Sequence, residues 1–235
     1  MKKLPDKKAK SGKIIVIGTS HISGESVRMT REVIEKERPD CVAVELDFKR
    51  LQGMRAGKGS NRDAFAVLGP INFVFFIMMK WVQGMLSKKT GVFPGEEMLK
   101  AVDVAEENKI QVALVDRDIA ITFERLKGVG FFEKFNLILF MFSGIILGPI
   151  IGLFSKDNKI DLNKVPDKEL INDATEEIRK RFPGIYRVLI GERDRYIASR
   201  LIVISKSYKK IVAFIGAGHK ESVQKIIDRE SQKPS

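Results

Sequence analysis

Cysteine and histidine are scarce in this chain of 235 residues, and their scarcity limits the kinds of metal, disulfide and catalytic site that the chain can form. Cys41 is the sole cysteine, so an intramolecular disulfide and a Cys-x-x-Cys metal site are excluded. It lies inside an apolar run, which predicts a small buried hydrophobic residue and fits a reducing compartment. The only two histidines are His21 and His219, so any imidazole chemistry comes from these two positions.

The start of the chain also lacks the apolar stretch of a signal peptide, although residues 1–13 contain six lysines. We expect residues 1–12 to form a basic flexible tail and residues 13–235 to form a single domain. The chain stops at Ser235, soon after the last predicted helix, so we expect no C-terminal transmembrane anchor. The expected location is cytoplasmic, with peripheral contact to a membrane as an option.

Positive charge is in excess, with 42 Lys and Arg against 30 Asp and Glu and a net charge of +12. This excess favours an anionic partner, namely a membrane surface, a nucleic acid or an acidic substrate. The basic residues are dispersed, and neither a recognition helix nor a stacking platform stands out. The pattern therefore disfavours nucleic acid as the partner.

Short apolar runs alternate with segments of helical spacing. Strands are predicted at residues 13–17, 41–46, 110–115 and 210–215, and a loop at 53–62. Helices are predicted at 24–37, 96–108, 119–127, 167–181, 185–205 and about 220–230. The strand at 41–46 is nearly all apolar, as is typical of a parallel strand covered on both faces. The sequence thus predicts an α/β fold with a largely parallel central sheet of about four or more strands flanked by helices.

Two segments are more apolar than an ordinary amphipathic helix, and we predict an inserted pair of very apolar helices at 64–86 and 131–154. Phe135–Ser155 carries no charge and is long enough to cross a bilayer. Spanning by the second segment alone, or by both, would place strands of one sheet on opposite sides of the membrane. We therefore expect the two helices to pair and to present a homodimer interface, a lipid-facing patch or a hydrophobic substrate groove.

Side chains capable of chemistry follow each predicted strand. Gly18-Thr19-Ser20-His21 follows the first strand, and Gly216-Ala217-Gly218-His219 follows the last. Glu45 ends the second strand, and Asp116-Arg117-Asp118 follows the third. Ligands bind at the carboxyl ends of strands in open parallel sheets, so we expect these side chains to line one cleft. Gly18 and Gly216 are expected to turn the backbone sharply, so that each histidine returns over the end of the sheet.

Two imidazoles and one carboxylate suit a divalent metal ion with open coordination positions, and Zn, Mn, Fe and Co all accept these ligands. A bound cation lowers the pKa of its water, as hydrolysis near neutral pH requires. Each residue also has an ordinary structural alternative as a turn histidine, an ion-paired acid or a helix cap. The glycines at 216 and 218 permit phosphate binding too, but the full dinucleotide motif is missing.

Five blocks together resemble one protein family, the TraB/PrgY family, and run in its order through nearly the whole chain. The blocks are GTSHISGESVRMTREVIEKERPDCVAVELDFKR from Gly18, PGEEMLKAV from Pro94, VALVDRDIAITFERL from Val112, PGIYRVLIGERDRYIASRL from Pro183 and VAFIGAGH from Val212. The resemblance implies a fold related to the erythromycin-esterase/ChaN-like α/β proteins. Relatives called TIKI proteases are divalent-metal peptidases with the same His and Glu pattern, and pheromone-shutdown relatives act on peptide signalling at the membrane.

The resemblance also implies site residues. His21, Glu45 and His219 match the family's two Gly-x-x-His motifs and its glutamate, and are implied as metal ligands or as holders of the attacking water. Glu97 and Asp116 match two further acidic positions, and either is a further ligand or the general base. Arg117 and Arg193 match basic positions that suit a substrate carboxylate or an oxyanion. Ion pairs of these two arginines with Asp118 and Asp194 are the structural alternative.

Two functions of different class follow from these observations. The first is a metal-dependent, peptidase-like hydrolase that works on a peptide or protein at or near a membrane. The second is a non-enzymatic, membrane-associated regulator that captures a signalling peptide or partner protein in the same cleft.

Overall fold

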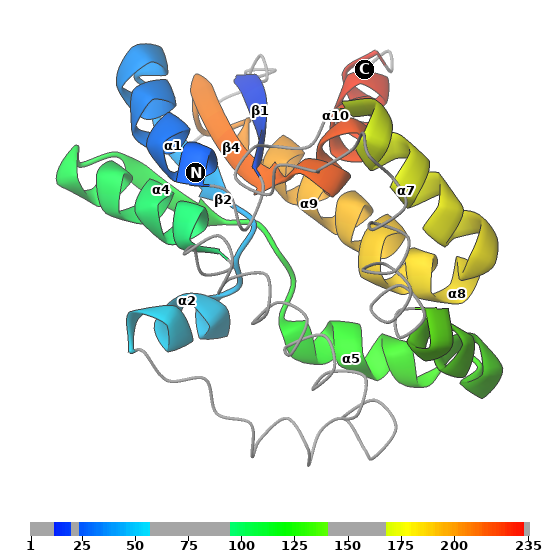
Figure 1. Cartoon of the computed structure of the whole chain (residues 1–235). Helices are drawn as coiled ribbons and strands as arrows, with labels where there is room; N and C mark the ends of the chain where they lie inside the picture. Colours follow the sequence, from blue (N-terminus) through cyan, green and yellow to red (C-terminus); the bar gives the residue numbers. More distant parts are fainter. Residues whose placement is uncertain (1–11, 20–23, 57–94, 141–167, 233–235) are drawn as a thin grey trace, which may run out of the picture.

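A computed structural model gives the fold and describes residues 12–19, 24–56, 95–140 and 168–232 (Figure 1). The strands are β1 (Lys13–Thr19), β2 (Cys41–Val44), β3 (Gln111–Leu114) and β4 (Lys210–Gly216). The helices are α1 (Gly24–Glu37), α2 (Phe48–Arg55), α4 (Glu96–Glu107), α5 (Ile119–Lys127), α7 (Lys168–Arg181), α8 (Pro183–Tyr186), the π-helix η1 (Arg187–Gly191), α9 (Glu192–Ile204) and α10 (Ala217–Ser231).

The strands form one parallel sheet in the order β1-β4-β2-β3. This confirms the predicted α/β class and parallel sheet. The last strand lies between the first two, with Gly216 opposite Thr19 and Phe214 opposite both Ile17 and Val44. The carboxyl ends of β1, β2 and β4 therefore meet, although β4 is far from the other two in sequence.

Helices cover both faces of the sheet (Figure 1). Val212 and Phe214 of β4 pack on the cluster that holds α1 and α4, whereas Ile211, Ala213 and Ile215 pack on the cluster that holds α9 and α10. This alternation follows from the two-residue period of a strand, and all five side chains are fully buried. The sheet is thus the middle layer of three.

Cys41 lies in the cluster on the α9 and α10 side and is fully buried, as its apolar surroundings in the sequence predict. Burial raises the pKa of its thiol to about 11, with a smaller contribution from the negative charge of Asp40. A thiol of this kind is protonated at neutral pH and is an inert core residue.

The predicted pair of apolar helices has no support in the described residues. The segment 64–86 lies outside them, as does 141–154, while residues 131–140 are helical. In the described part of the chain, no helix has the length and apolar character needed to cross a membrane. Part of helix 131–140 packs on α5 and α8 through a third core cluster that contains Leu126, Leu137 and Ile185.

Two predicted segments are wrong in detail. The predicted loop at 53–62 begins inside α2, a helix that was not predicted and that runs to Arg55, while residues 57–62 lie outside the described residues. Asp47 caps this helix by accepting hydrogen bonds from the backbone N–H groups of Lys49 and Arg50. The predicted single helix at 185–205 is divided into α8, the π-helix η1 and α9. Glu192 N–H bonds to Arg187 O, five residues back, and this inserts one extra residue into the helical turn.

Helices α1 and α4 are each followed by a basic residue in the left-handed conformation: Arg38, directly after α1, has φ of 46°, and Lys109, two residues after α4, has φ of 55°. After α4, the N–H of Ile110 bonds to Ala105 O at 2.8 Å and the N–H of Lys109 to Glu106 O at 3.0 Å. Glycine is the usual residue at such a helix end, because a Cβ crowds the left-handed backbone. Lys109 therefore carries local strain.

Replacing Lys109 by glycine should stabilise the protein by about 0.5–1 kcal/mol, because the relief of left-handed strain exceeds the added chain entropy of the unfolded state. Urea unfolding measures this change. Lys100→Gly, inside α4, is the matched control and should lose about 1 kcal/mol. An equal loss in both variants would show that the backbone at Lys109 is not strained.

Candidate active site

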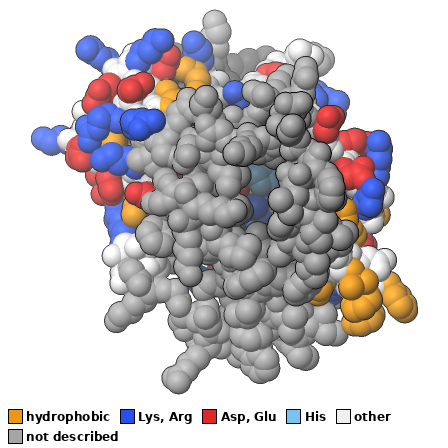
Figure 2. Space-filling view, viewed as in Figure 1, with side chains coloured by type: hydrophobic (Ala, Val, Ile, Leu, Met, Phe, Trp, Pro, Cys, Tyr) orange, Lys and Arg blue, Asp and Glu red, His pale blue; other side chains and the backbone are white. Residues whose placement is uncertain are grey.

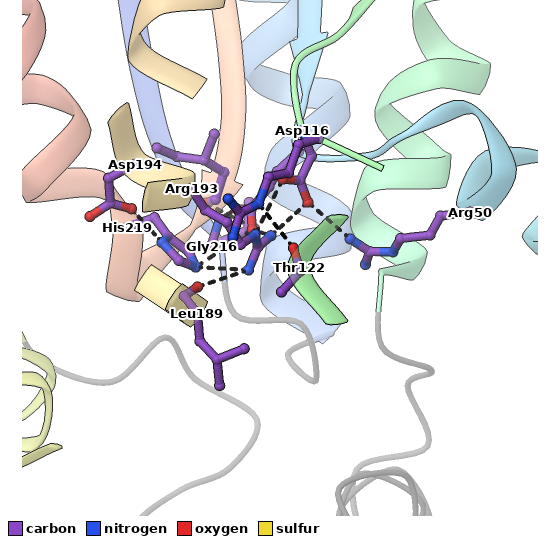
Figure 3. Close-up of polar contacts among 12 residues, drawn as sticks. Arg50, Asp116, Thr122, Leu189, Arg193, Asp194, Gly216 and His219 are labelled. Carbon is purple, nitrogen blue, oxygen red and sulfur yellow. Dashed lines mark hydrogen bonds and ion pairs between the residues drawn. The ribbon is translucent and has the colours of Figure 1, made fainter. Parts of the chain in front are cut away.

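The carboxyl ends of the strands hold a compact cluster of charged side chains (Figure 3). Glu45 follows β2 and Asp116 follows β3, and backbone bonds from Glu45 N–H to Phe214 O and from Asp116 N–H to Leu46 O continue the strand pairing there. His219 enters from the first turn of α10, directly after β4. The sequence predicted that these three side chains would meet; His21, predicted to join them, lies outside the described residues.

The guanidinium of Arg193, from α9, lies at the centre of this cluster (Figure 3). Its Nη2 donates to Glu45 Oε1 at 2.5 Å and to Asp116 Oδ2 at 2.6 Å, and its Nε donates to Asp116 Oδ1 at 3.2 Å. The two carboxylates are buried, with side-chain exposures of 2% and 3%. Burial alone lowers the pKa of Arg193, but the charges of Glu45 and Asp116 outweigh it and raise the pKa above its ordinary value.

Glu45 is held at both of its carboxylate oxygens. Its Oε1 accepts a hydrogen bond from Arg193, and its Oε2 accepts one from the backbone N–H of Gly216 at 2.6 Å. Gly216 precedes the first turn of α10, so the carboxylate also meets the positive end of that helix dipole. Glu45 therefore joins β2, α9 and the start of α10.

His219 makes two kinds of contact through its two ring nitrogens. Nδ1 lies 2.6 Å from Asp194 Oδ1, whereas Nε2 lies 3.4 Å from Arg193 Nη1 and 3.6 Å from Glu45 Oε1. Burial lowers the pKa of His219, but the charge of Glu45 and the hydrogen bond with Asp194 outweigh it, so the pKa is raised. The imidazole is thus held by Asp194 at Nδ1, and its Nε2 faces Glu45.

The glycine turns predicted for the histidine motifs are absent from the described backbone. Gly18 lies within β1, and Gly216 has φ of −56° and ψ of 139°, values that any residue adopts. A Cβ on Gly18 would lie 2.9 Å from Lys220 Cδ and 3.4 Å from Ala217 Cα. A side chain at position 18 would press mainly on the flexible Lys220 side chain, so the glycine eases the packing of α10 on β1. His219 reaches the site because α10 starts directly at the end of β4.

Arg117 points away from the acids of the cluster. Its guanidinium donates to Thr122 Oγ1 at 3.0 Å, Glu192 Oε2 at 3.0 Å and the carbonyl of Val188 at 2.8 Å. It therefore ties the end of β3 to α5 and to the π-helix. The suggested structural pairs of Arg117 with Asp118 and of Arg193 with Asp194 are both wrong, because Asp118 caps α5 and pairs with Lys49, while Asp194 pairs with His219.

The π-helix supplies backbone acceptors to both arginines. Since Glu192 N–H bonds to Arg187 O, the carbonyl of Val188 is left for Arg117. The carbonyl of Leu189 accepts a long bond of 3.5 Å from Arg193 Nη1. This feature has no signature in composition or spacing, and the sequence did not reveal it.

Two further charged residues border the cluster. Glu97 is fully buried at the start of α4, where its Oε1 accepts Thr19 Oγ1 at 3.4 Å beside the end of β1. Arg50 of α2 reaches Asp116 Oδ2 at 3.4 Å from the side opposite Arg193 (Figure 3). The family resemblance matched Glu97, and Arg50 is the last residue of the first resembling block, but only the fold brings Arg50 to Asp116.

Comparison with known proteins identifies the family of this chain. The model of the TraB/PrgY/gumN family matches residues 5–234. This chain belongs to the TraB/PrgY/gumN family. An uncharacterized protein of Methanocaldococcus jannaschii is 32% identical over 227 residues, covering 92% of this chain and 53% of the relative. The TraB domain-containing protein of Homo sapiens is 24% identical over 242 residues, covering 91% of this chain and 62% of that protein. This TraB-family chain thus spans little more than half the length of these relatives.

Two donor atoms of this TraB-family site have a spacing that is relevant to a divalent metal ion. With metal–ligand bonds of about 2.0–2.2 Å, two ligands at a tetrahedral angle lie about 3.3–3.6 Å apart. Glu45 Oε1 and His219 Nε2 are 3.6 Å apart, which is the separation of two ligands of one ion, and Arg193 contacts both atoms, at 2.5 Å and 3.4 Å, so an ion bound there would have to displace its guanidinium. No group of three or more metal-binding side chains occurs among the described residues, and the third predicted ligand, His21, lies outside them.

Arg193→Met should destabilise the protein by about 3–5 kcal/mol, because it leaves Glu45 and Asp116 buried without their shared cation. Urea unfolding of the metal-free protein measures the loss. Arg195→Met is the matched control, since Arg195 is exposed on the same helix, and it should change stability by about 0.5 kcal/mol or less. Equal, small losses in the two variants would contradict the bridging role of Arg193.

Proposed function

We propose that this TraB-family chain is a metal-dependent hydrolase of peptides, with Glu45, His219 and His21 as ligands. The observation that carries the proposal is the convergence of Glu45 Oε1 and His219 Nε2, 3.6 Å apart, at the carboxyl ends of β2 and β4. Both side chains are held by further hydrogen bonds, as metal ligands usually are. The resemblance to the TIKI proteases supports a peptide as the substrate.

When bound, the cation would supply an activated water and a polarised carbonyl. The remaining roles fall to the charged neighbours. Asp116 accepts from both Arg193 and Arg50, so in this proposal it holds the two guanidiniums instead of accepting a proton. Arg50 has a side-chain exposure of 33% and spends one long bond on Asp116, which leaves donors for a substrate carboxylate. Glu97 stays the candidate general base, because it accepts a hydrogen bond from Thr19, which belongs to the same Gly-x-x-His motif as His21.

Metal uptake tests the proposal directly. The chain should be stripped with a chelator, reloaded separately with Mn²⁺, Zn²⁺ and Co²⁺, and desalted, and its metal content measured by elemental mass spectrometry. We expect about one ion per chain for at least one of these metals, and a loss of at least about tenfold in affinity in Glu45→Gln, His219→Gln and His21→Gln, because each substitution removes a ligand. The loaded protein should also cleave members of a mixed peptide library.

Asp228→Asn is the matched control, because Asp228 is exposed on the same helix as His219 and binds only Gln224 among the described side chains. Its metal content should equal that of the wild type. Unchanged metal content in Glu45→Gln and His219→Gln would refute the metal site, and a loaded protein that cleaves no peptide would refute the reaction.

A second candidate, a membrane-associated regulator, is supported by one surface. Phe131, Phe132 and Phe135 of helix 131–140 have exposures of 54%, 77% and 46%, and Leu139 one turn further on is half exposed. Figure 2 shows hydrophobic side chains gathered over this part of the molecule, at the lower right. An exposed apolar patch of this kind is typical of an interaction surface, including a lipid surface or a second copy of the chain.

Serine at all three phenylalanines should reduce the fraction bound to anionic liposomes about tenfold or more, because each buried phenylalanine contributes to membrane binding. Sedimentation with liposomes measures this fraction, and chemical crosslinking with and without liposomes reports the dimer. Phe48→Ser removes an exposed phenylalanine elsewhere and should leave binding unchanged. A wild-type protein that is a monodisperse monomer and does not sediment with liposomes would exclude both membrane binding and dimer formation through this surface.

A further inference from the structure

Asp194 is a fully buried carboxylate with a single described partner. Its Oδ1 lies 2.6 Å from His219 Nδ1, and its Oδ2 has no hydrogen-bond partner among the described residues. Burial of an ionised carboxylate is costly, so the contact with His219 has to compensate for most of that cost. The contact with His219 therefore explains why a buried acid is found at position 194 of α9.

The types of donor and acceptor around His219 decide which ring nitrogen carries a proton. An ionised carboxylate only accepts hydrogen bonds, so the short contact with Asp194 requires a proton on Nδ1. The guanidinium of Arg193 only donates, and it lies 3.4 Å from Nε2. Nε2 also faces an acceptor, Glu45 Oε1, but at the longer distance of 3.6 Å. In the neutral ring with its proton on Nδ1, Nε2 carries the lone pair, and its nearer partner is the Arg193 donor.

We infer that Asp194 is a positioning residue for His219: it holds the ring through Nδ1–H and so keeps the Nε2 lone pair directed at the site. The inference rests on the proposed function for what Nε2 would bind, but the tautomer itself is a property of the metal-free chain. Carboxylates that hold the distant nitrogen of a metal-binding histidine fix its orientation and raise its basicity. Asp194 has the same relation to His219.

The position of Asp194 on α9, next to Arg193, determines which group each of the two side chains reaches. Arg193 and Asp194 are adjacent, so their side chains leave the helix about 100° apart. Arg193 meets the acids after β2 and β3, whereas Asp194 meets α10. Helix α9 therefore supplies the Arg193 guanidinium to Glu45 and, through Asp194, orients the His219 imidazole that faces Glu45.

The tautomer of His219 can be read by NMR, because the chain has only two histidines. Long-range ¹H–¹⁵N spectra of the metal-free protein, at a pH where the rings are neutral, separate Nδ1–H from Nε2–H forms, and His219→Gln assigns the signals. We expect His219 in the Nδ1–H form in the wild type. Asp194→Asn should release the ring toward the Nε2–H form and weaken Mn²⁺, Zn²⁺ or Co²⁺ binding by about 10–100-fold.

Asp228→Asn, which removes an exposed acid on α10, should leave both the tautomer and the metal affinity unchanged. An Nε2–H form in the wild type would overturn the inference, as would an Asp194→Asn protein that keeps both the Nδ1–H form and the wild-type affinity. The wild-type spectrum decides the first point even if Asp194→Asn does not fold. A wild type that binds no metal but shows Nδ1–H would refute the proposed function and support the positioning role of Asp194.

Discussion

The site depends on one interaction, the Arg193 guanidinium that bridges Glu45 and Asp116 at 2.5 Å and 2.6 Å. Two buried carboxylates at neighbouring strand ends repel each other and lose their hydration, so the fold must bring a cation to both. A planar guanidinium does this through Nη2 and Nε, which are fixed in one plane, whereas the donors of an ammonium have no such fixed fork. The bridge also fixes α9 against the ends of β2 and β3, and it places Asp194 against α10.

The same bridge defines the chemistry of the site. Glu45 is divided between Arg193 at one oxygen and the Gly216 N–H at the other, so its carboxylate has one orientation. His219 is held through Nδ1 and faces Glu45 with Nε2. A convergent oxygen and nitrogen, both buried and both supported by further hydrogen bonds, are what a divalent cation requires of two of its ligands. Arg50 adds a partly exposed basic side chain at the edge of the site.

Much of this arrangement could be predicted from the sequence, for a physical reason. Apolar runs gave the strands, and the shared direction of parallel strands brought Glu45, Asp116 and His219 together. The ion pairs could not be predicted, because Arg193 lies 148 residues from Glu45 and its partner depends on the strand order. The π-helix depends on one backbone bond and has no residue signature. The prediction of glycine turns was wrong, because Gly18 lies within β1 and Gly216 has backbone angles that any residue adopts. His21 and most of the two apolar segments lie outside the described residues.

The central claim, that Glu45 and His219 share one divalent cation, is tested most directly by anomalous X-ray diffraction. Crystals of the Mn²⁺-, Zn²⁺- or Co²⁺-loaded protein should be measured above and below the absorption edge of the metal. We expect one anomalous peak within about 2.3 Å of both Glu45 Oε1 and His219 Nε2. A metal-loaded crystal without a peak at this position, with Arg193 still on Glu45, would contradict the account.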